Sequence, residues 1–239
     1  MKEQLTLGRW DRKELGRMVR AASVIRSIPE RIDALSRAFL GIPYRESTLI
    51  GSPFEAETFV VNLESVDCFT FIDYVEAMRL SASFEGFCDN LKKVRYRHGI
   101  VSYATRMHFF TDWLDTSRVK DVTFEVGGEK IQAVTKTMNR KSDGSSFVPG
   151  IPEKERRFAF IPSSLFDEAV IGRLRTGDYG GIYAEAEGLD VSHVGIIVAE
   201  EGRLLFRHAS SIERRVLDED LLAYLTGKPG IVVLRPCGS

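Results

Sequence analysis

The chain has 239 residues, enough to bury the core of one large domain or of two small ones. Its 44% hydrophobic and 28% charged residues are typical of globular proteins, and a formal net charge of -1 excludes the strongly basic surface of proteins that bind nucleic acids or anionic membranes. Two local basic pairs, Arg156-Arg157 and Arg214-Arg215, stand beside acidic residues and are assigned to solvated helix faces.

Helical periodicity dominates the first third of the chain. Apolar residues recur there at intervals of three, four and seven, with Pro29 and Gly41 as breaks and a predicted loop from Ile42 to about Ser65. No apolar run approaches the roughly 18 residues of a membrane span. The predicted helices cover residues 15–25, 32–39, 68–78 and 84–94.

The second half changes to the patterns of β-structure. Residues 122–126 and 131–134 flank a Gly-Gly pair and predict a β-hairpin, while the polar segment Asn139–Ser146 predicts a mobile loop that could serve as a lid. Three further strands are predicted at residues 193–198, 204–208 and 231–235. Helices followed by strands indicate an α+β fold, in which N-terminal helices pack on an antiparallel sheet. We expect one catalytic domain, with a helical half over residues 1–115 and a β half over residues 116–239.

The three cysteines differ in their surroundings. Their odd number and wide spacing exclude a closed disulfide framework and predict no metal site. Cys88 lies on an apolar helix stripe, and Cys237 is next to the C-terminus. Cys68 follows Asp67, a good N-cap, and would therefore lie in the first turn of a helix, where free amides and the helix dipole favour the thiolate. The alternative is that Cys68 is only the first core residue of that helix.

A cysteine nucleophile needs an imidazole as its base and a third polar group to orient that imidazole. Of the four histidines, His193 begins an apolar strand. If the following turn spans residues 199–202, His193 and His208 face each other across a hairpin, with Cβ atoms roughly 5 Å apart. His208 can then orient His193. The alternative is a pair of unrelated strand histidines.

These residues resemble the NlpC-type papain-like cell-wall hydrolases. The resemblance implies a papain-like fold, in which Cys68 is the nucleophile, His193 the base and His208 the orienting residue. It spans about two-thirds of the chain. The motifs that carry it are Gly41-Ile42-Pro43-Tyr44, Asp67-Cys68, His193-Val194-Gly195-Ile196 and His208-Ala209-Ser210.

A narrower branch of that superfamily, the N-acetylmuramoyl-L-alanine amidase-like proteins, is more similar still. Most of the superfamily has serine and glycine after the cysteine, whereas this chain has Cys68-Phe69-Thr70-Phe71. Two positions depart from the branch, Asp73 in place of glutamate and Phe109 in place of tyrosine. The similarity also rests on the segments 106–113 and Gly188-Leu189-Asp190.

Several other polar residues are candidates for substrate binding. Arg106, His108 and Asp112 are predicted to form a polar cluster that binds a stem-peptide carboxylate or lines the cleft, and a purely structural network is the alternative. Asp178 and Asp190 are assigned to turns instead. The candidate substrate-binding residues are Tyr44, Asp67, Arg106, His108, Asp112 and Ser192.

The resemblance implies hydrolysis of the amide between N-acetylmuramic acid and L-alanine in a muropeptide, through an acyl-enzyme and without a cofactor. Three alternatives stay open: a γ-D-glutamyl-diamino acid endopeptidase with the same triad, acyl transfer to an amine, and a non-catalytic peptidoglycan-binding module. The N-terminal residues lack the apolar segment of a secretory signal. We therefore expect the periplasm or cell envelope of a bacterium if a signal has been removed, and the cytoplasm otherwise.

Overall fold

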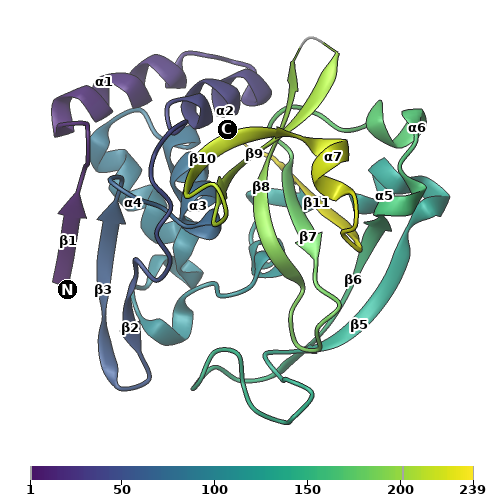
Figure 1. Cartoon of the computed structure of the whole chain (residues 1–239). Coiled ribbons are helices and arrows are strands. Elements are labelled where there is room, and N and C mark those ends of the chain that lie inside the picture. The colour runs from purple at the N-terminus through teal and green to yellow at the C-terminus, as the bar shows by residue number, and fades with distance from the viewer. Residues whose placement is uncertain (1, 201, 239) are drawn as a thin grey trace. The chain divides into compact units, whose positions relative to one another are not determined.

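The computed structural model describes residues 2–200 and 202–238, which fold as two compact units (Figure 1). The first unit contains residues 2–107 and 207–218, and the second contains residues 108–206 and 219–238. Both combine helices with β-strands, so the predicted α+β class is confirmed. Whether the units form the single catalytic domain expected from the sequence stays a prediction.

The first unit has four helices, each of which begins at a side-chain N-cap: Asp11, Ser27, Asp67 or Ser83. Their buried faces meet in an aromatic core, in which the ring centroids of Phe39 and Phe71 lie 5.5 Å apart. The helices are α1 (Arg12–Ser23), α2 (Ile28–Arg37), α3 (Cys68–Arg79) and α4 (Phe84–Arg95).

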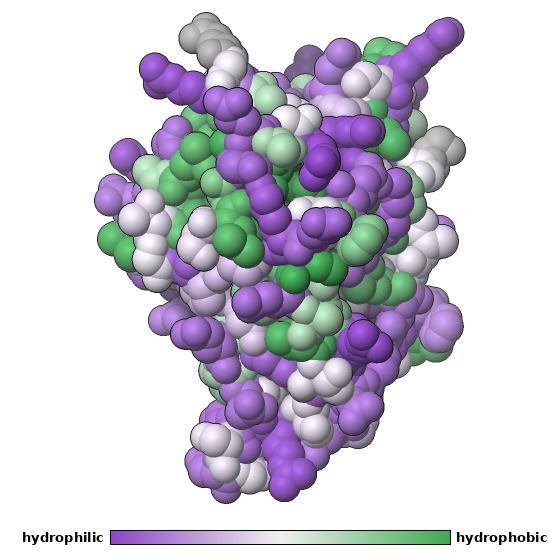
Figure 2. All heavy atoms as spheres, turned by 90° about the vertical axis from the view of Figure 1, so that its right-hand side faces the viewer, coloured by the Kyte–Doolittle hydropathy of each residue, from purple (hydrophilic) through white to green (hydrophobic). Residues whose placement is uncertain are grey.

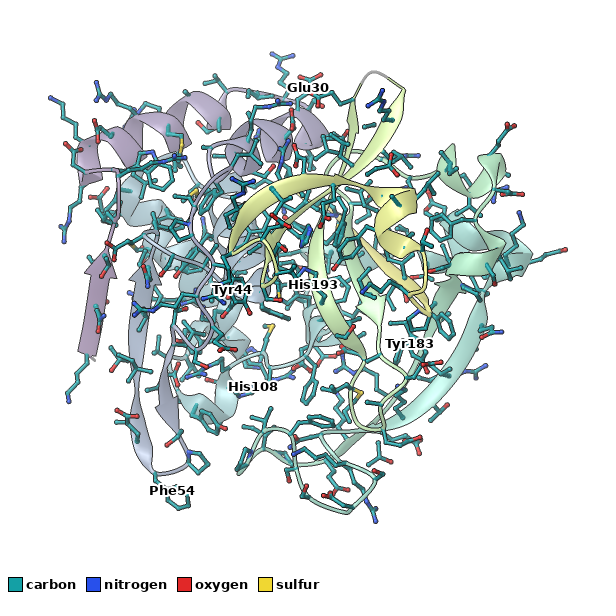
Figure 3. The ribbon with its side chains drawn as sticks, in the orientation of Figure 1. Glu30, Tyr44, Phe54, His108, Tyr183 and His193 are labelled. Atoms are coloured by element: carbon teal, nitrogen blue, oxygen red, sulfur yellow. The ribbon has the colours of Figure 1, made fainter. Side chains whose placement is uncertain are left out.

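A small sheet completes this unit. It has the order β1-β3-β2, where β1 (Lys2–Thr6) runs parallel to β3 (Glu55–Asn62) and β2 (Ile50–Ser52) runs antiparallel to it. The predicted loop over residues 42–65 is therefore wrong. The run Phe59-Val60-Val61 is buried on both faces of β3, so it lacks the period-two alternation that marks a half-exposed strand. Figure 3 shows Phe54 at the tip of the β2–β3 hairpin.

The second unit is built on an antiparallel sheet of order β9-β8-β7-β11-β6-β5, to which β4 is added beside β11. Its core packs apolar residues of the strands against the helices α5 (Thr123–Gly127), α6 (Glu168–Ile171) and α7 (Leu221–Leu225). On the outside, hydrophobic residues form separate areas among hydrophilic ones (Figure 2). The strands are β4 (Val119–Asp121), β5 (Gln132–Met138), β6 (Lys154–Pro162), β7 (Tyr179–Tyr183), β8 (Val191–Glu200), β9 (Arg203–Ser210) and β11 (Gly230–Pro236). The short helices are η3 (Phe110–Asp115), α5 (Thr123–Gly127), η4 (Gly128–Lys130), η5 (Ser163–Leu165), α6 (Glu168–Ile171) and α7 (Leu221–Leu225).

The hairpin predicted over residues 122–134 is wrong. Residues 123–127 form α5, and just before it the Asp121 side chain accepts a hydrogen bond from the Thr123 amide at 2.8 Å. β5 pairs instead with β6, from Gln132 opposite Phe160 to Met138 opposite Lys154. The partner strand therefore lies more than 15 residues further along the chain, beyond the reach of a local turn signal.

β9 crosses the boundary between the units, because residues 203–206 belong to the second and residues 207–210 to the first. β9 is followed by β10 (Arg215–Asp220), its neighbour in the sheet, of which residues 215–218 belong to the first unit. The predicted strands at residues 193–198, 204–208 and 231–235 are confirmed by β8, β9 and β11. Among the described residues, no helix is long and apolar enough to cross a membrane.

The segment Asn139–Ser146 is anchored at its first residue. Asn139 is fully buried, and its side chain donates to the Val148 and Ile151 carbonyls at 2.9 and 2.7 Å and accepts from the Val148 amide at 2.7 Å. The backbone of Asn139 has a φ of 72°. One end of this segment is therefore fixed to the second unit, and its role as a lid stays a prediction.

Candidate active site

Cys68 is the first residue of α3. The Asp67 carboxylate accepts hydrogen bonds from the Thr70 amide at 2.7 Å and the Thr70 hydroxyl at 2.9 Å, and the Asp67 amide donates to that hydroxyl at 3.0 Å. Asp67 is thus the N-cap that the sequence predicts, and its carboxylate is committed to the helix start. The half-buried thiol of Cys68 lies where the positive end of the helix dipole stabilises a thiolate.

The other two cysteines have different environments. Burial raises the pKa of the Cys88 thiol to about 11, so that this side chain stays protonated at neutral pH. Cys237 donates a hydrogen bond from its thiol to the Ser117 carbonyl at 3.2 Å. Cys68 is therefore the cysteine whose position suits nucleophilic chemistry.

Tyr44 lies beside the helix that carries Cys68, on the segment between α2 and β2 (Figure 3). The Val66 amide donates to the Pro43 carbonyl at 3.0 Å, and the Arg45 amide donates to the Val66 carbonyl at 2.9 Å. These bonds fix Tyr44 next to the start of α3. Partial burial and the negative charges of Cys68, Asp67 and Glu46 raise the pKa of its phenol.

His193 lies near the start of β8, immediately after a β-bulge. Ile182 pairs with His193 but Tyr183 pairs with Val191, so Ser192 is the extra residue of the longer strand. Its hydroxyl donates to the Ile182 carbonyl at 3.4 Å. Because a bulge changes which face of the sheet the next side chain occupies, Ser192 sets the direction of His193.

Two aromatic rings flank the His193 imidazole. Phe206 on β9 lies 6.2 Å from it in an edge-on arrangement, and Tyr224 on α7 lies 6.1 Å from it, measured between ring centroids. Such contacts restrict the rotation of the imidazole. His193 is half-buried, so it keeps access to solvent.

Two buried ionisable groups, Asp190 and Lys136, hold the chain that leads into β8. Asp190 accepts hydrogen bonds from the Thr111 amide at 2.6 Å and the Thr111 hydroxyl at 2.7 Å, and burial is the main cause that raises its pKa. The Lys136 ammonium donates to the Ala184, Ala186 and Leu189 carbonyls. Asp190 lies in the bend that leads into β8, next to the predicted turn, and also anchors this segment. Asp178 closes its predicted turn by accepting from the Arg175 amide at 2.9 Å, and it also accepts two hydrogen bonds from the Arg235 guanidinium, at 2.7 and 2.8 Å.

His208 lies on β9 and is 1% exposed. Its neighbour Arg207 is fully buried and binds the Asp218 carboxylate through two hydrogen bonds at 2.7 and 2.8 Å. Arg207 also donates to the Asp33 carboxylate at 2.8 Å and the Ser36 hydroxyl at 2.9 Å. This clamp fixes the strand segment that carries His208 to α2 and β10.

The structure divides the predicted cluster of Arg106, His108 and Asp112. Arg106 is paired through two hydrogen bonds with the buried Glu57 carboxylate. Asp112 accepts from the His108 and Phe109 amides at 3.1 and 3.2 Å. Arg106 is thus bound to a carboxylate of the protein itself, whereas Asp112 shapes the backbone at His108.

The two basic pairs that the sequence assigned to helix faces both lie elsewhere. Arg156 is on β6 and pairs with Asp112 and Asp115 at 3.1 Å each. Arg214 lies in a turn and Arg215 begins β10. Short-range acidic neighbours therefore misled the assignment, because they do not distinguish a helix face from a strand or a turn.

Cys68 and His208 lie in the first unit and His193 lies in the second. Their assembly into a catalytic triad stays a prediction. Residues 199 and 200, which were predicted to lie in the turn, belong to β8, and β9 begins at Arg203. The rest of the predicted turn includes position 201, which lies outside the described residues.

A cavity of about 560 Å³ lies in the second unit between η5 and α7, and none of the candidate residues lines it. Its walls combine the apolar side chains of Phe166, Leu222 and Leu225 with two serines. Among the described residues, no group of three or more histidine, cysteine, aspartate or glutamate side chains is placed to hold a metal ion.

Comparison with protein families identifies one match over most of the chain. The sequence model of the N-acetylmuramoyl-L-alanine amidase-like family matches residues 34–231. No curated protein matches the chain significantly.

Several solved structures share the fold. A Legionella pneumophila protein superposes with a TM-score of 0.81 at 21% identity, covering 95% of this chain and 94% of its own, and this likeness shows the fold alone. An N-acetylmuramoyl-L-alanine amidase from Bacteroides uniformis is 26% identical with a TM-score of 0.73, covering 88% of this chain and 99% of its own. A Bacteroides fragilis protein described as a proposed xylanase is 26% identical with a TM-score of 0.68, covering 84% and 99%.

Proposed function

Because the chain belongs to the N-acetylmuramoyl-L-alanine amidase-like family, we propose that it is a cysteine amidase that cleaves the bond between N-acetylmuramic acid and L-alanine in muropeptides. The family supports a hydrolase that acts on cell-wall amides. The cysteine mechanism and the papain-like arrangement of its residues are part of the proposal.

One observation carries the mechanism: Cys68 lies at the first position of a helix whose start is fixed by the Asp67–Thr70 capping box. This position supplies unpaired backbone amides and the positive end of the helix dipole to one sulfur atom. The same features lower the free energy of a thiolate and of the oxyanion that forms when it attacks a carbonyl. Cys88, with its raised pKa, has no comparable advantage.

In the proposed reaction, His193 accepts the Cys68 proton and the thiolate attacks the carbonyl of the lactyl amide. The tetrahedral intermediate collapses when His193 returns the proton to the L-alanine nitrogen, which leaves as the amino terminus of the stem peptide. Water, deprotonated by His193, then attacks the thioester and releases N-acetylmuramic acid. His208 holds the imidazole in the productive tautomer.

The test is digestion of an N-acetylmuramyl-tripeptide, with the products identified by mass. The proposal requires N-acetylmuramic acid and the intact tripeptide in equal amounts. Cys68→Ala should form neither product while unfolding at nearly the same temperature. Continued release by Cys68→Ala would refute the cysteine mechanism, and a peptide transferred to an added amine would instead indicate acyl transfer.

A further inference from the structure

Arg214 differs from the buried arginines of this protein in having no carboxylate partner among the described residues. Arg79, Arg95 and Arg207 each pair with an aspartate or glutamate, which offsets the cost of burying a charge. Arg214 is exposed, and its guanidinium carbon lies 5.1 Å from the centroid of the Tyr44 ring. Its hydrogen-bond donors are therefore held in place without being used by the protein.

The backbone around Arg214 is built to keep this position. The Tyr44 amide donates to the Arg214 carbonyl at 2.9 Å, the Val216 amide donates to the Ile42 carbonyl at 2.8 Å, and the Gly41 amide donates to the Val216 carbonyl at 2.9 Å. These bonds align residues 41–44 with residues 214–216. Arg214 is therefore joined to Tyr44 twice, through its backbone carbonyl and through the contact of its side chain with the Tyr44 ring.

Arg214 also has a strained backbone, with a φ of 58° in the left-handed region that favours glycine. The turn before it is closed by a hydrogen bond from the Glu213 amide to the Ser210 hydroxyl at 3.1 Å. Residues held in such conformations gather at ligand-binding sites, where the strain fixes a side chain in advance. Glycine adopts this conformation without strain. An arginine at this position therefore indicates that its side chain has a use.

Tyr44 connects Arg214 to the nucleophile. The negative charges of Cys68 and Asp67 raise the pKa of the Tyr44 phenol, and the positive charge of Arg214 lowers it. The Asp67 carboxylate accepts its hydrogen bonds from Thr70, and no ion pair joins it to Arg214 among the described residues. All of these residues belong to the first unit.

We propose that Arg214, whose guanidinium lies over the Tyr44 ring, binds a free carboxylate in the peptide part of the substrate and so determines specificity for acidic stem peptides. A guanidinium held over a ring by a cation–π contact keeps its N–H groups as donors, and two of them can form parallel hydrogen bonds with a carboxylate. This inference rests on the proposed function, because it takes a muropeptide as the substrate. It does not depend on which bond of the muropeptide is cut.

The test measures binding in the Cys68→Ala background, where no turnover occurs. Two ligands are compared: N-acetylmuramyl-L-alanyl-γ-D-glutamyl-L-lysine with its carboxylates free, and the same compound with both carboxylates converted to amides. Each ligand is titrated by calorimetry into three proteins that all carry Cys68→Ala. The first has no further change, the second also carries Arg214→Gln, and the third also carries Arg215→Gln. Arg215 is the matched control, since it is exposed and pairs with Pro43 only through its backbone.

We expect Arg214→Gln to weaken binding of the acidic ligand about 10-fold to 100-fold, the loss typical of a charge-assisted hydrogen bond, and to change binding of the amidated ligand little. Arg215→Gln should leave both affinities nearly unchanged. Arg214→Gly provides a second variant that relieves the backbone strain, and it should show the same loss for the acidic ligand.

An equal loss for both ligands, the same effect from Arg215→Gln, or no loss at all would overturn the role of Arg214. The absence of measurable binding of either ligand would overturn it as well. Failure of the proposed function is recognised separately, because it changes the products that the unmodified chain releases from the acidic ligand and leaves the comparison of affinities intact.

Discussion

The thiol environments at the residue scale predict different reactivities. Cys68 lies at a capped helix start, whereas burial raises the pKa of Cys88 to about 11. Because the thiolate is the reactive form, iodoacetamide near pH 6 should modify Cys68 well before Cys88. Peptide mapping by mass spectrometry measures the two rates. Equal rates, or faster modification of Cys88, would count against Cys68 as the nucleophile.

The two histidines of the proposed triad should not be equivalent. Loss of the proton acceptor removes general acid–base catalysis, a contribution of about 10²-fold to 10⁴-fold, whereas loss of an orienting group leaves a weakened base in place. We therefore expect His193→Ala to be essentially inactive and His208→Ala to keep a small residual rate. The comparison is of kcat on an N-acetylmuramyl-tripeptide.

His208 is buried, so the unfolding temperature of His208→Ala must be measured together with its activity. A folded His193→Ala variant with full activity would overturn the mechanism. His108, which lies next to the Asp112-bound backbone, would then be the histidine to test as the base.

At the scale of elements, Asp190 gives a pH dependence of stability. Its pKa is raised above the ordinary value of 3.8, mainly by burial, so the protonated carboxyl favours the folded state. This contribution is present in full below about pH 4 and is lost as the pH rises through the raised pKa. The unfolding temperature of the unmodified chain, relative to that of Asp190→Asn, should therefore fall as the pH rises from 4 to 7. A constant or rising difference would show that Asp190 does not titrate in this way.

The four long helices of the first unit could be predicted from the sequence because their signals are local. The stripe that begins at Cys68 and the N-cap at Asp67 lie within one helix length, and α3 has these boundaries. β8, β9 and β11 were also predicted, since each is a short apolar run next to a turn. The β5–β6 pair was missed because its partners are far apart along the chain.

The candidate site shows the same division between local and distant information. Cys68 could be singled out from its own helix start. The bulge at Ser192, the Lys136 contacts with three carbonyls and the stacking of Arg214 on Tyr44 all depend on segments that are distant in sequence. Arg214 had been assigned to a solvated face because its sequence neighbours are charged, and only the pairing of residues 41–44 with 214–216 places it on an aromatic ring.

For the whole molecule, the family match over residues 34–231 covers both units, so the segments that carry Cys68, His193 and His208 all lie within it. Arg214 lies in the same matched range. The residues of the proposed triad are distributed over both units. Its central claim is that the amide between the sugar and the peptide is cut.

Cleavage of that bond requires the sugar, because much of the binding energy available in the transition state must come from that side of the amide. The direct measurement compares an N-acetylmuramyl-tripeptide with the same tripeptide without the sugar, with the products identified by mass. We predict release of intact tripeptide from the first and little or no cleavage of the second. Recovery of the L-Ala-D-Glu dipeptide from the sugar-free substrate would contradict the amidase and identify a γ-D-glutamyl endopeptidase instead.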